Sequence, residues 1–377
     1  MNVTIHGCTR HYRTVTFDRA HNAVLLIEQR WLPHEFKIVA TRNFRKTAAA
    51  IRDMVVRGAP AIAATAAYGL AQGALAFRGR ALAKFSRHIE DVYQTLKAAR
   101  PTAVDPVNAM NTVRAAMCAG KTVEEQQALA IAAAEEFANE DVRHCEAIGR
   151  HGAELIRNGM KILTHCNAGW LACVDIGTAT APMYAAQAQG KTFHVFCSET
   201  RPRSQGATLT AWELAGQKIS HQVIADNAAG HLMQRGEIDL VIVGSDRTLG
   251  RTGEVANKIG TYTHAAVAKR HGIPFHVAIP FSTIDWQLKS GFDIPIEERH
   301  PDEVLGAWGV VERLKAGGKR LKGGEQAYVR VANPASGARN PGFDVTPPEL
   351  ITGILTPAGT VKPDELWQRR HELGFAG

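Results

Sequence analysis

The chain has 377 residues, enough for two domains, because single hydrophobic cores rarely grow beyond ~250–300 residues. Its hydrophobic and charged fractions, 45% and 21%, are those of a soluble globular protein and exclude a disordered or fibrous one. The formal net charge of +8 comes from Lys and Arg scattered along the chain, which favours small anionic ligands over a nucleic-acid surface.

The sequence shows no sign of a secretory signal, a membrane span or a disulfide framework. The first residues, MNVTIHGCTRHYRTV, are polar and lack the apolar core of a secretory signal. The most apolar stretch, 59–77, is Ala-rich and interrupted by polar residues, which predicts a buried helix and no membrane span. The six cysteines form no C-x-x-C pair, so we expect reduced thiols and a cytoplasmic protein.

Residues 1–147 are predicted to form an α-rich domain with a few short strands. The alternating stretch 5–40 contains the clearest early strand, Ala23–Gln29. Apolar residues spaced by three and four then predict helices at Thr47–Val56, Pro60–Ala76, Leu82–Ala99 and Val123–Ile148.

Residues 148–377 are predicted to form a second, α/β domain. Short β-branched or aromatic runs alternate here with helical segments, at Ile162–His165, Thr192–Ser198, Lys218–Ile224, Leu240–Gly244 and Pro274–Ile279. This alternation is typical of a parallel, doubly wound sheet. The Gly-rich segment 306–342 is expected to be an insertion.

A cysteine and an aspartate follow two of these strands. Cys166 comes after 162–165 and Asp246 after 240–244. Ligands of open α/β sheets bind beyond the carboxyl ends of the strands, so we expect both side chains to face one pocket. A thiol beside a carboxylate forms a pair that can handle protons, which makes the chain a candidate enzyme.

Each residue of the pair also has a structural explanation. A free Cys is most often a buried small hydrophobe, although His165 and Asn167 give Cys166 polar neighbours. Asp246 could instead form a salt bridge with Arg247 or Lys258. The sequence leaves both alternatives open.

Several segments supply candidate contacts to an anionic ligand. Arg57 precedes Gly58, Ala59 and a proline at the start of a predicted helix, an arrangement suited to phosphate. The other candidates lie near predicted helix or strand ends: Arg100, Gln205, Asn257 and Lys258. The simpler explanations are a loop–helix junction at Arg57 and a helix-dipole contact at Arg100.

No cofactor or metal is expected. The chain contains no G-x-G-x-x-G fingerprint, which argues against a dinucleotide. The histidines are dispersed and show no H-E-x-x-H or comparable ligand spacing.

Together these segments resemble the methylthioribose-1-phosphate isomerase family, which is related to the regulatory subunits of the translation-initiation guanine-nucleotide exchange factor. The similar stretches occur in a fixed order along nearly the whole chain: VVRGAPAI (55–62), ARPTAV (99–104), ILTHCNAG (162–169), ETRPRSQGA (199–207), DNAAGHLM (226–233), VGSDR (243–247), GEVANKIGTY (253–262) and FDVTPPELIT (343–352). Three positions depart from the usual pattern: Thr208, Ser245 and the pair Asp105-Pro106.

The resemblance implies a small N-terminal domain with a helical bundle, a Rossmann-like C-terminal domain and a homodimer. It also implies an aldose–ketose isomerase of methionine salvage that acts on a phosphorylated pentose. Its reaction converts 5-methylthioribose 1-phosphate into 5-methylthioribulose 1-phosphate. Cys166 and Asp246 match the family's catalytic pair; Arg57, Gly58, Ala59, Arg100, Gln205, Asn257 and Lys258 match its substrate-binding positions. Activity on 5-deoxyribose 1-phosphate or ribose 1,5-bisphosphate, and a regulatory role without turnover, are the alternatives.

Overall fold

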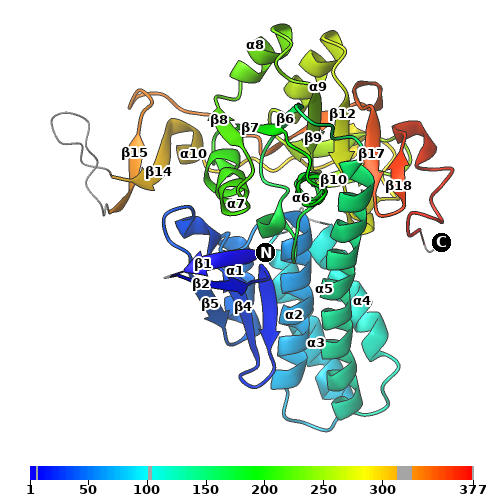
Figure 1. The fold of residues 1–377 in the computed structure, drawn as a ribbon. Coiled ribbons are helices and arrows are strands. Elements are labelled where there is room, and N and C mark those ends of the chain that lie inside the picture. The colour runs from blue at the N-terminus through cyan, green and yellow to red at the C-terminus, as the bar shows by residue number, and fades with distance from the viewer. Residues whose placement is uncertain (6, 101–103, 312–324, 376–377) are drawn as a thin grey trace.

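The computed structural model describes residues 1–5, 7–100, 104–311 and 325–375. A bundle of long helices with small sheets beside it stands against a larger sheet that carries helices of its own (Figure 1). None of the helices in the described part of the chain combines the length and hydropathy that a membrane crossing requires.

The N-terminal bundle is built around one Ala-rich helix. The helices are α1 (Phe44–Arg52), α2 (Ala59–Ala76), α3 (Leu82–Ala98), α4 (Asp105–Met117) and α5 (Val123–Ala153). Nearly every residue of α2 is buried, because its small side chains let the other four helices and β4 pack closely around it. The predicted buried helix is therefore confirmed.

Two small antiparallel sheets complete the N-terminal part. They are β1 (Asn2–Ile5) with β2 (Cys8–His11), and β3 (Val15–Asp18), β4 (Ala23–Ile27) and β5 (Ile38–Thr41) in that order. Val15, Val24 and Leu26 are fully buried and share a core with the bundle, so the second sheet covers one side of α2.

The large sheet has the doubly wound order of a dinucleotide-binding fold. Its strands are β6 (Lys161–Thr164), β7 (His194–Ser198), β8 (His221–Ile224), β9 (Leu240–Val243), β12 (Phe275–Ala278), β17 (Gly353–Thr356) and β18 (Gly359–Val361). They lie in the order β18-β17-β12-β9-β6-β7-β8, and all but β18 are parallel. The strand order reverses between β6 and β9, which makes this the topological switch point.

Helices cover both faces of this sheet, as a doubly wound fold requires. The flanking helices are α6 (Ala181–Ala188), α7 (Ala211–Gly216), α8 (Ala228–Gln234) and α9 (Thr261–Arg270). Successive residues of β6 enter different cores: Leu163 packs with α8 and α9, and Ile162 packs with α6 and α7. The predicted fold class is confirmed.

Helix α5 belongs to both cores. Its first half packs in the bundle, and Ile148 and Ala153 at its end pack against the large sheet. The proposed boundary between residues 147 and 148 falls inside this helix, and it stays a prediction.

The rest of the chain forms smaller elements around the large sheet. A four-stranded sheet has the order β13 (Ile284–Asp285), β10 (Arg247–Leu249), β11 (Val255–Lys258) and β16 (Phe343–Thr346). Within the expected insertion 306–342, β14 (Gly306–Val310) and β15 (Gln326–Arg330) pair as a hairpin after α10 (Asp302–Leu305); residues 312–324 lie outside the described residues. Short helices are η1 (Gln29–Trp31), η2 (Trp170–Ala172), η3 (Gly206–Thr210), η4 (Phe281–Thr283), η5 (Gly291–Asp293), η6 (Pro348–Leu350) and η7 (Pro363–Glu365).

Candidate active site

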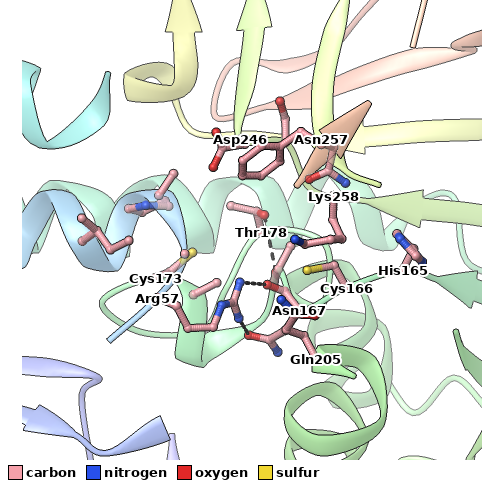
Figure 2. A pocket seen from close by; sticks show the side chains of 18 of the residues that line it. Arg57, His165, Cys166, Asn167, Cys173, Thr178, Gln205, Asp246, Asn257 and Lys258 are labelled. Atoms are coloured by element: carbon pink, nitrogen blue, oxygen red, sulfur yellow. Dashed lines mark hydrogen bonds between the residues drawn. The ribbon is translucent and has the colours of Figure 1, made fainter. Parts of the chain in front are cut away.

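A cavity opens where the switch point of the large sheet meets the N-terminus of α2 (Figure 2). Its volume is about 80 Å³. One water needs only ~10–15 Å³, so the cavity has room for a small ligand. All the residues singled out from the sequence line it: Arg57, Gly58, Ala59, Arg100, Cys166, Gln205, Asp246, Asn257 and Lys258.

The backbone at Cys166 adopts a conformation that is uncommon for a side chain other than glycine. Cys166 has φ 64°, and Thr200 beside it has φ 67°. The Cys166 N–H donates to Thr200 Oγ1 at 2.8 Å, and its carbonyl accepts from Thr210 Oγ1 at 2.7 Å. Backbone strain of this kind persists only where surrounding contacts impose it, and it concentrates at functional sites.

Asp226 orders the loop that holds Cys166. Its carboxylate accepts the backbone N–H groups of Thr200 at 2.6 Å and Arg201 at 2.7 Å. Thr200 Oγ1 in turn accepts a hydrogen bond from the Cys166 N–H, so Asp226 fixes the position of Cys166 through Thr200. Its position two residues after β8, at the end of a strand, is the sequence signal that could have identified Asp226.

Two buried histidines lie behind Cys166. His165 Nε2 lies 2.9 Å from the Ile259 carbonyl, and His165 Nδ1 lies 3.3 Å from His264 Nε2. The Ser198 hydroxyl sits within hydrogen-bond distance of both rings and donates to Asp226. Burial lowers the pKa of His165, and it lowers the pKa of His264 to about 3, so both rings are neutral at pH 7.

Asp246 faces the same cavity from the end of β9. Its backbone N–H donates to the Ala256 carbonyl at 3.0 Å, which holds it beside β11. Burial raises the pKa of Asp246 above its ordinary value, although nearby cations, Arg100 first among them, act in the opposite direction. A carboxyl group with a raised pKa can keep a proton at higher pH than an exposed one.

The proposed salt-bridge partners of Asp246 have other contacts. Arg247 forms an ion pair with Asp285 at 3.3 Å, and Lys258 Nζ donates to the Gly342 carbonyl at 3.0 Å. Both cations still act on Asp246 electrostatically.

Cations dominate the described lining of the cavity. Arg57, Arg100, Lys258 and Arg299 line it, against the single carboxylate of Asp246. Burial, and then the charge of Arg299, lowers the pKa of Lys258 to about 8. An excess of cations in a partly closed site favours an anionic ligand.

Arg57 is held in place by a fork of two hydrogen bonds. Its guanidinium donates to Asn167 Oδ1 at 2.6 Å and to the Asn167 carbonyl at 2.8 Å. The Asn167 amide donates to the buried Glu213 at 2.9 Å, and Glu213 also accepts from Tyr184. The contacts of Arg57 point to a built site and not to the exposed arginine of a simple loop–helix junction.

The glycine before α2 brings the helix start to the cavity wall. Gly58 has φ +91°, and a Cβ there would lie 2.4 Å from Ala172 Cα. Only glycine therefore lets this helix N-terminus approach the η2 segment. Its first N–H groups have no partner within the helix, and the helix dipole favours an anion beside them.

Two amides complete the predicted set. Gln205 is buried, and its Oε1 has no hydrogen-bond partner among the described residues. It precedes η3, a π-helical turn of the kind that is frequent at functional sites. Asn257 donates to Thr261 Oγ1 at 3.0 Å.

Arg299 is the lining cation that the sequence did not predict. It pairs with Glu297 at 3.1 Å, and Arg100 approaches the same carboxylate at 3.5 Å. Its Nε is buried and has no partner in the described ranges. The surrounding sequence, EERHPDE, is typical of a solvent-exposed run of charged residues, so no sequence signal distinguished Arg299.

Comparisons with known proteins show the family to which this chain belongs. The model of the initiation factor 2 subunit family matches residues 55–363, most of the chain. The chain belongs to this family. A relative in Sinorhizobium medicae named methylthioribose-1-phosphate isomerase is 47% identical over 360 residues, covering 93% of this chain and 94% of the relative.

Solved structures of the initiation factor 2 subunit family share the whole fold. The 5-methylthioribose 1-phosphate isomerase of Pyrococcus horikoshii has a TM-score of 0.81 and 40% identity, over 97% of this chain and 96% of that one. A protein of A. fulgidus described as translation initiation factor eIF-2B subunit delta has a TM-score of 0.79 and 37% identity, over 97% and 100%. Both classes that the sequence motifs suggested therefore occur among its relatives.

Proposed function

We propose that this chain is the aldose–ketose isomerase that converts 5-methylthioribose 1-phosphate into 5-methylthioribulose 1-phosphate in methionine salvage. One observation carries the proposal: Cys166 and Asp246 face a single cation-rich cavity at the switch point of the sheet. The near full-length relatives named methylthioribose-1-phosphate isomerase support the same reaction.

The cations would bind and orient the phosphate. Arg57 already presents a fixed guanidinium, and the start of α2 adds backbone donors. Arginine forks match phosphate oxygens, so they hold the sugar in one orientation. Positioning of this kind can supply several kcal/mol towards the barrier.

Asp246 would open the sugar ring. An aldose 1-phosphate has no free aldehyde, so the ring oxygen must receive a proton before hydrogen can move from C2 to C1. The raised pKa of Asp246 suits a general acid near neutral pH. The hydrogen on C2 can then reach C1 by two routes. Either Cys166 shuttles it as a proton through an enol phosphate, or it shifts as hydride beside a neutral Cys166.

Product formation from matched sugars tests the assignment. The purified protein is incubated with 5-methylthioribose 1-phosphate, 5-deoxyribose 1-phosphate and ribose 1,5-bisphosphate, and ketose is measured. We expect the 5-methylthio sugar to have the highest kcat/KM. Binding without ketose from any of the three would favour the regulatory-subunit alternative, the class to which the A. fulgidus relative's name belongs.

We also propose that the enzyme works in the cytoplasm as a homodimer without nucleic acid. All six cysteines are free thiols, which suits a reducing compartment. The β14–β15 hairpin exposes Trp308 (72%) and Val329 (53%), apolar side chains that a second subunit can cover. Light scattering on the purified protein measures the subunit number.

Replacing Arg57 with Ala is expected to weaken binding of the phosphate ester by about 10–150-fold, the equivalent of the ~1.5–3 kcal/mol of a charged hydrogen bond. Affinity is measured by calorimetry in an Asp246→Asn background, because KM alone is not a dissociation constant. Arg52→Ala is the control, since Arg52 is exposed on α1 and pairs only with Asp53 among the described residues. Equal affinities in the two variants would remove Arg57 from the phosphate site.

Substrate affinity is expected to fall as the pH rises past about 8. A base whose pKa is lowered loses its charge above that pKa, and Lys258 has a pKa of about 8. The dissociation constant, measured by calorimetry in the Asp246→Asn background, should therefore rise between pH 7 and pH 9. Lys258→Arg keeps the positive charge at high pH, so substrate affinity in this variant should change little between pH 7 and pH 9. If the variant shows the same pH dependence as the wild type, another group is responsible for it.

A further inference from the structure

Three donor side chains that the proposed mechanism does not use converge behind the cavity wall. Asp141 and Cys145 lie four residues apart on α5, and so on one face of the helix. Cys173 follows η2 and borders the cavity. One donor atom from each residue lies within 4.8 Å of the other two, and all three residues are buried.

The thiols of Cys145 and Cys173 interact with each other, but one buried oxygen of this cluster has no partner among the described residues. One carboxylate oxygen of Asp141 accepts from Val174 N–H at 2.7 Å, whereas the other, Oδ1, is buried without a partner among the described residues. Burial raises the pKa of Asp141 to about 7. The neighbouring Cys173, and then burial, raises the pKa of the Cys145 thiol. Buried polar atoms without partners are rare and need an explanation.

We propose that Asp141, Cys145 and Cys173 form a binding site for a thiophilic divalent cation of the zinc class. Two thiolates and a carboxylate are a donor set that such cations prefer over calcium or magnesium. With metal–ligand bonds of about 2.0–2.3 Å, tetrahedral donors lie roughly 3.5–3.8 Å apart. Donors already within 4.8 Å need only small inward shifts.

The charges of the metal-bound site can be counted. One Zn²⁺ enters while two thiol protons and the carboxyl proton leave, which gives a complex of net charge −1. Arg57 is close enough to act electrostatically on Cys173, so a cation is present to offset that charge. Cys173 borders the cavity, which offers an entry path. A bound ion would tie α5 to the wall against which Gly58 packs.

Metal binding is tested on the full chain, first freed of metal with a chelator under reducing conditions. Co²⁺ is the spectroscopic probe because thiolate ligation gives an intense charge-transfer absorption. We expect one Co²⁺ per chain with that absorption, displaced by Zn²⁺, and a higher Tm with Zn²⁺ than with a chelator. Cys145→Ser and Asp141→Asn should each weaken Zn²⁺ binding by more than ~100-fold, beyond the loss typical of an outer-shell change.

Cys197→Ala is the matched control, because Cys197 is equally buried but lies on β7 outside the cluster. It should bind Co²⁺ as the wild type does. The proposal is overturned if the wild type shows no thiolate absorption, if Cys145→Ser binds as tightly as wild type, or if Cys145 and Cys173 are recovered as a disulfide. Circular dichroism of each apo variant separates loss of the site from loss of the fold, and none of these readouts depends on the isomerase reaction.

Discussion

Replacing Asp246 with Asn is expected to lower kcat by about 10²–10⁴-fold, the range that general acid–base catalysis contributes. Asparagine has nearly the same shape, and the backbone hydrogen bond from residue 246 to Ala256 does not involve the side chain. The variant should therefore fold as the wild type does and still bind the phosphate ester. What it lacks is the proton for the ring oxygen.

The pH profile distinguishes an acid from a merely structural carboxylate. Because the acid form of Asp246 is the active one, kcat should fall as the pH rises through its raised pKa. The Asp246→Asn variant should lose this decline. Asp239→Asn is the control, since Asp239 lies at the opposite end of β9 and accepts from Lys161 N–H. Turnover near the wild-type rate in Asp246→Asn would remove the residue from the mechanism.

The sequence predicted that Cys166 and Asp246 would face one cavity because both residues follow buried parallel strands. Ile162 and Leu163 lead to Cys166, and the strand Leu240–Val243 leads to Asp246, so a rule about strand ends was sufficient. The strand order places these two strands side by side at the switch point, which the sequence did not specify. The helices with clear apolar spacing were also predicted, although α4 was not singled out within the helical region.

The supporting contacts were not predictable in the same way. Arg299 reaches the cavity from a segment with no periodicity, and Glu213 receives donors from residues 29 to 46 positions away. The Asp141–Cys145–Cys173 cluster joins a helix to a distant turn, so no local spacing reveals it. Such contacts depend on tertiary packing, which strand and helix patterns do not encode. Tertiary packing also places α5 in two hydrophobic cores. A domain boundary predicted from the sequence pattern has to fall at one residue, so it cannot describe a helix that both cores share.

Cys166→Ser is expected to abolish measurable turnover while the fold stays intact. The thiol lies in a buried position whose backbone is held by Thr200 and Thr210, and serine can keep both of those contacts. A hydroxyl is a much weaker acid than a thiol, so it is a poor shuttle for the C2 proton. Cys197→Ala is again the control for loss of a buried thiol, and a near wild-type rate in Cys166→Ser would show that the thiol is dispensable.

Substrate deuterated at C2 then decides what the thiol does. If Cys166 moves a proton, deuterium is exchanged with solvent, and Cys166→Ala is as inactive as Cys166→Ser. If hydrogen moves as hydride, deuterium is retained at C1 and Cys166 serves to keep the cavity apolar. Cys166→Ala should then be more active than Cys166→Ser, because alanine preserves the apolar wall while serine brings a hydroxyl that binds water. The order of the two variants and the fate of the label must agree, since both follow from whether the sulfur exchanges a proton with C2.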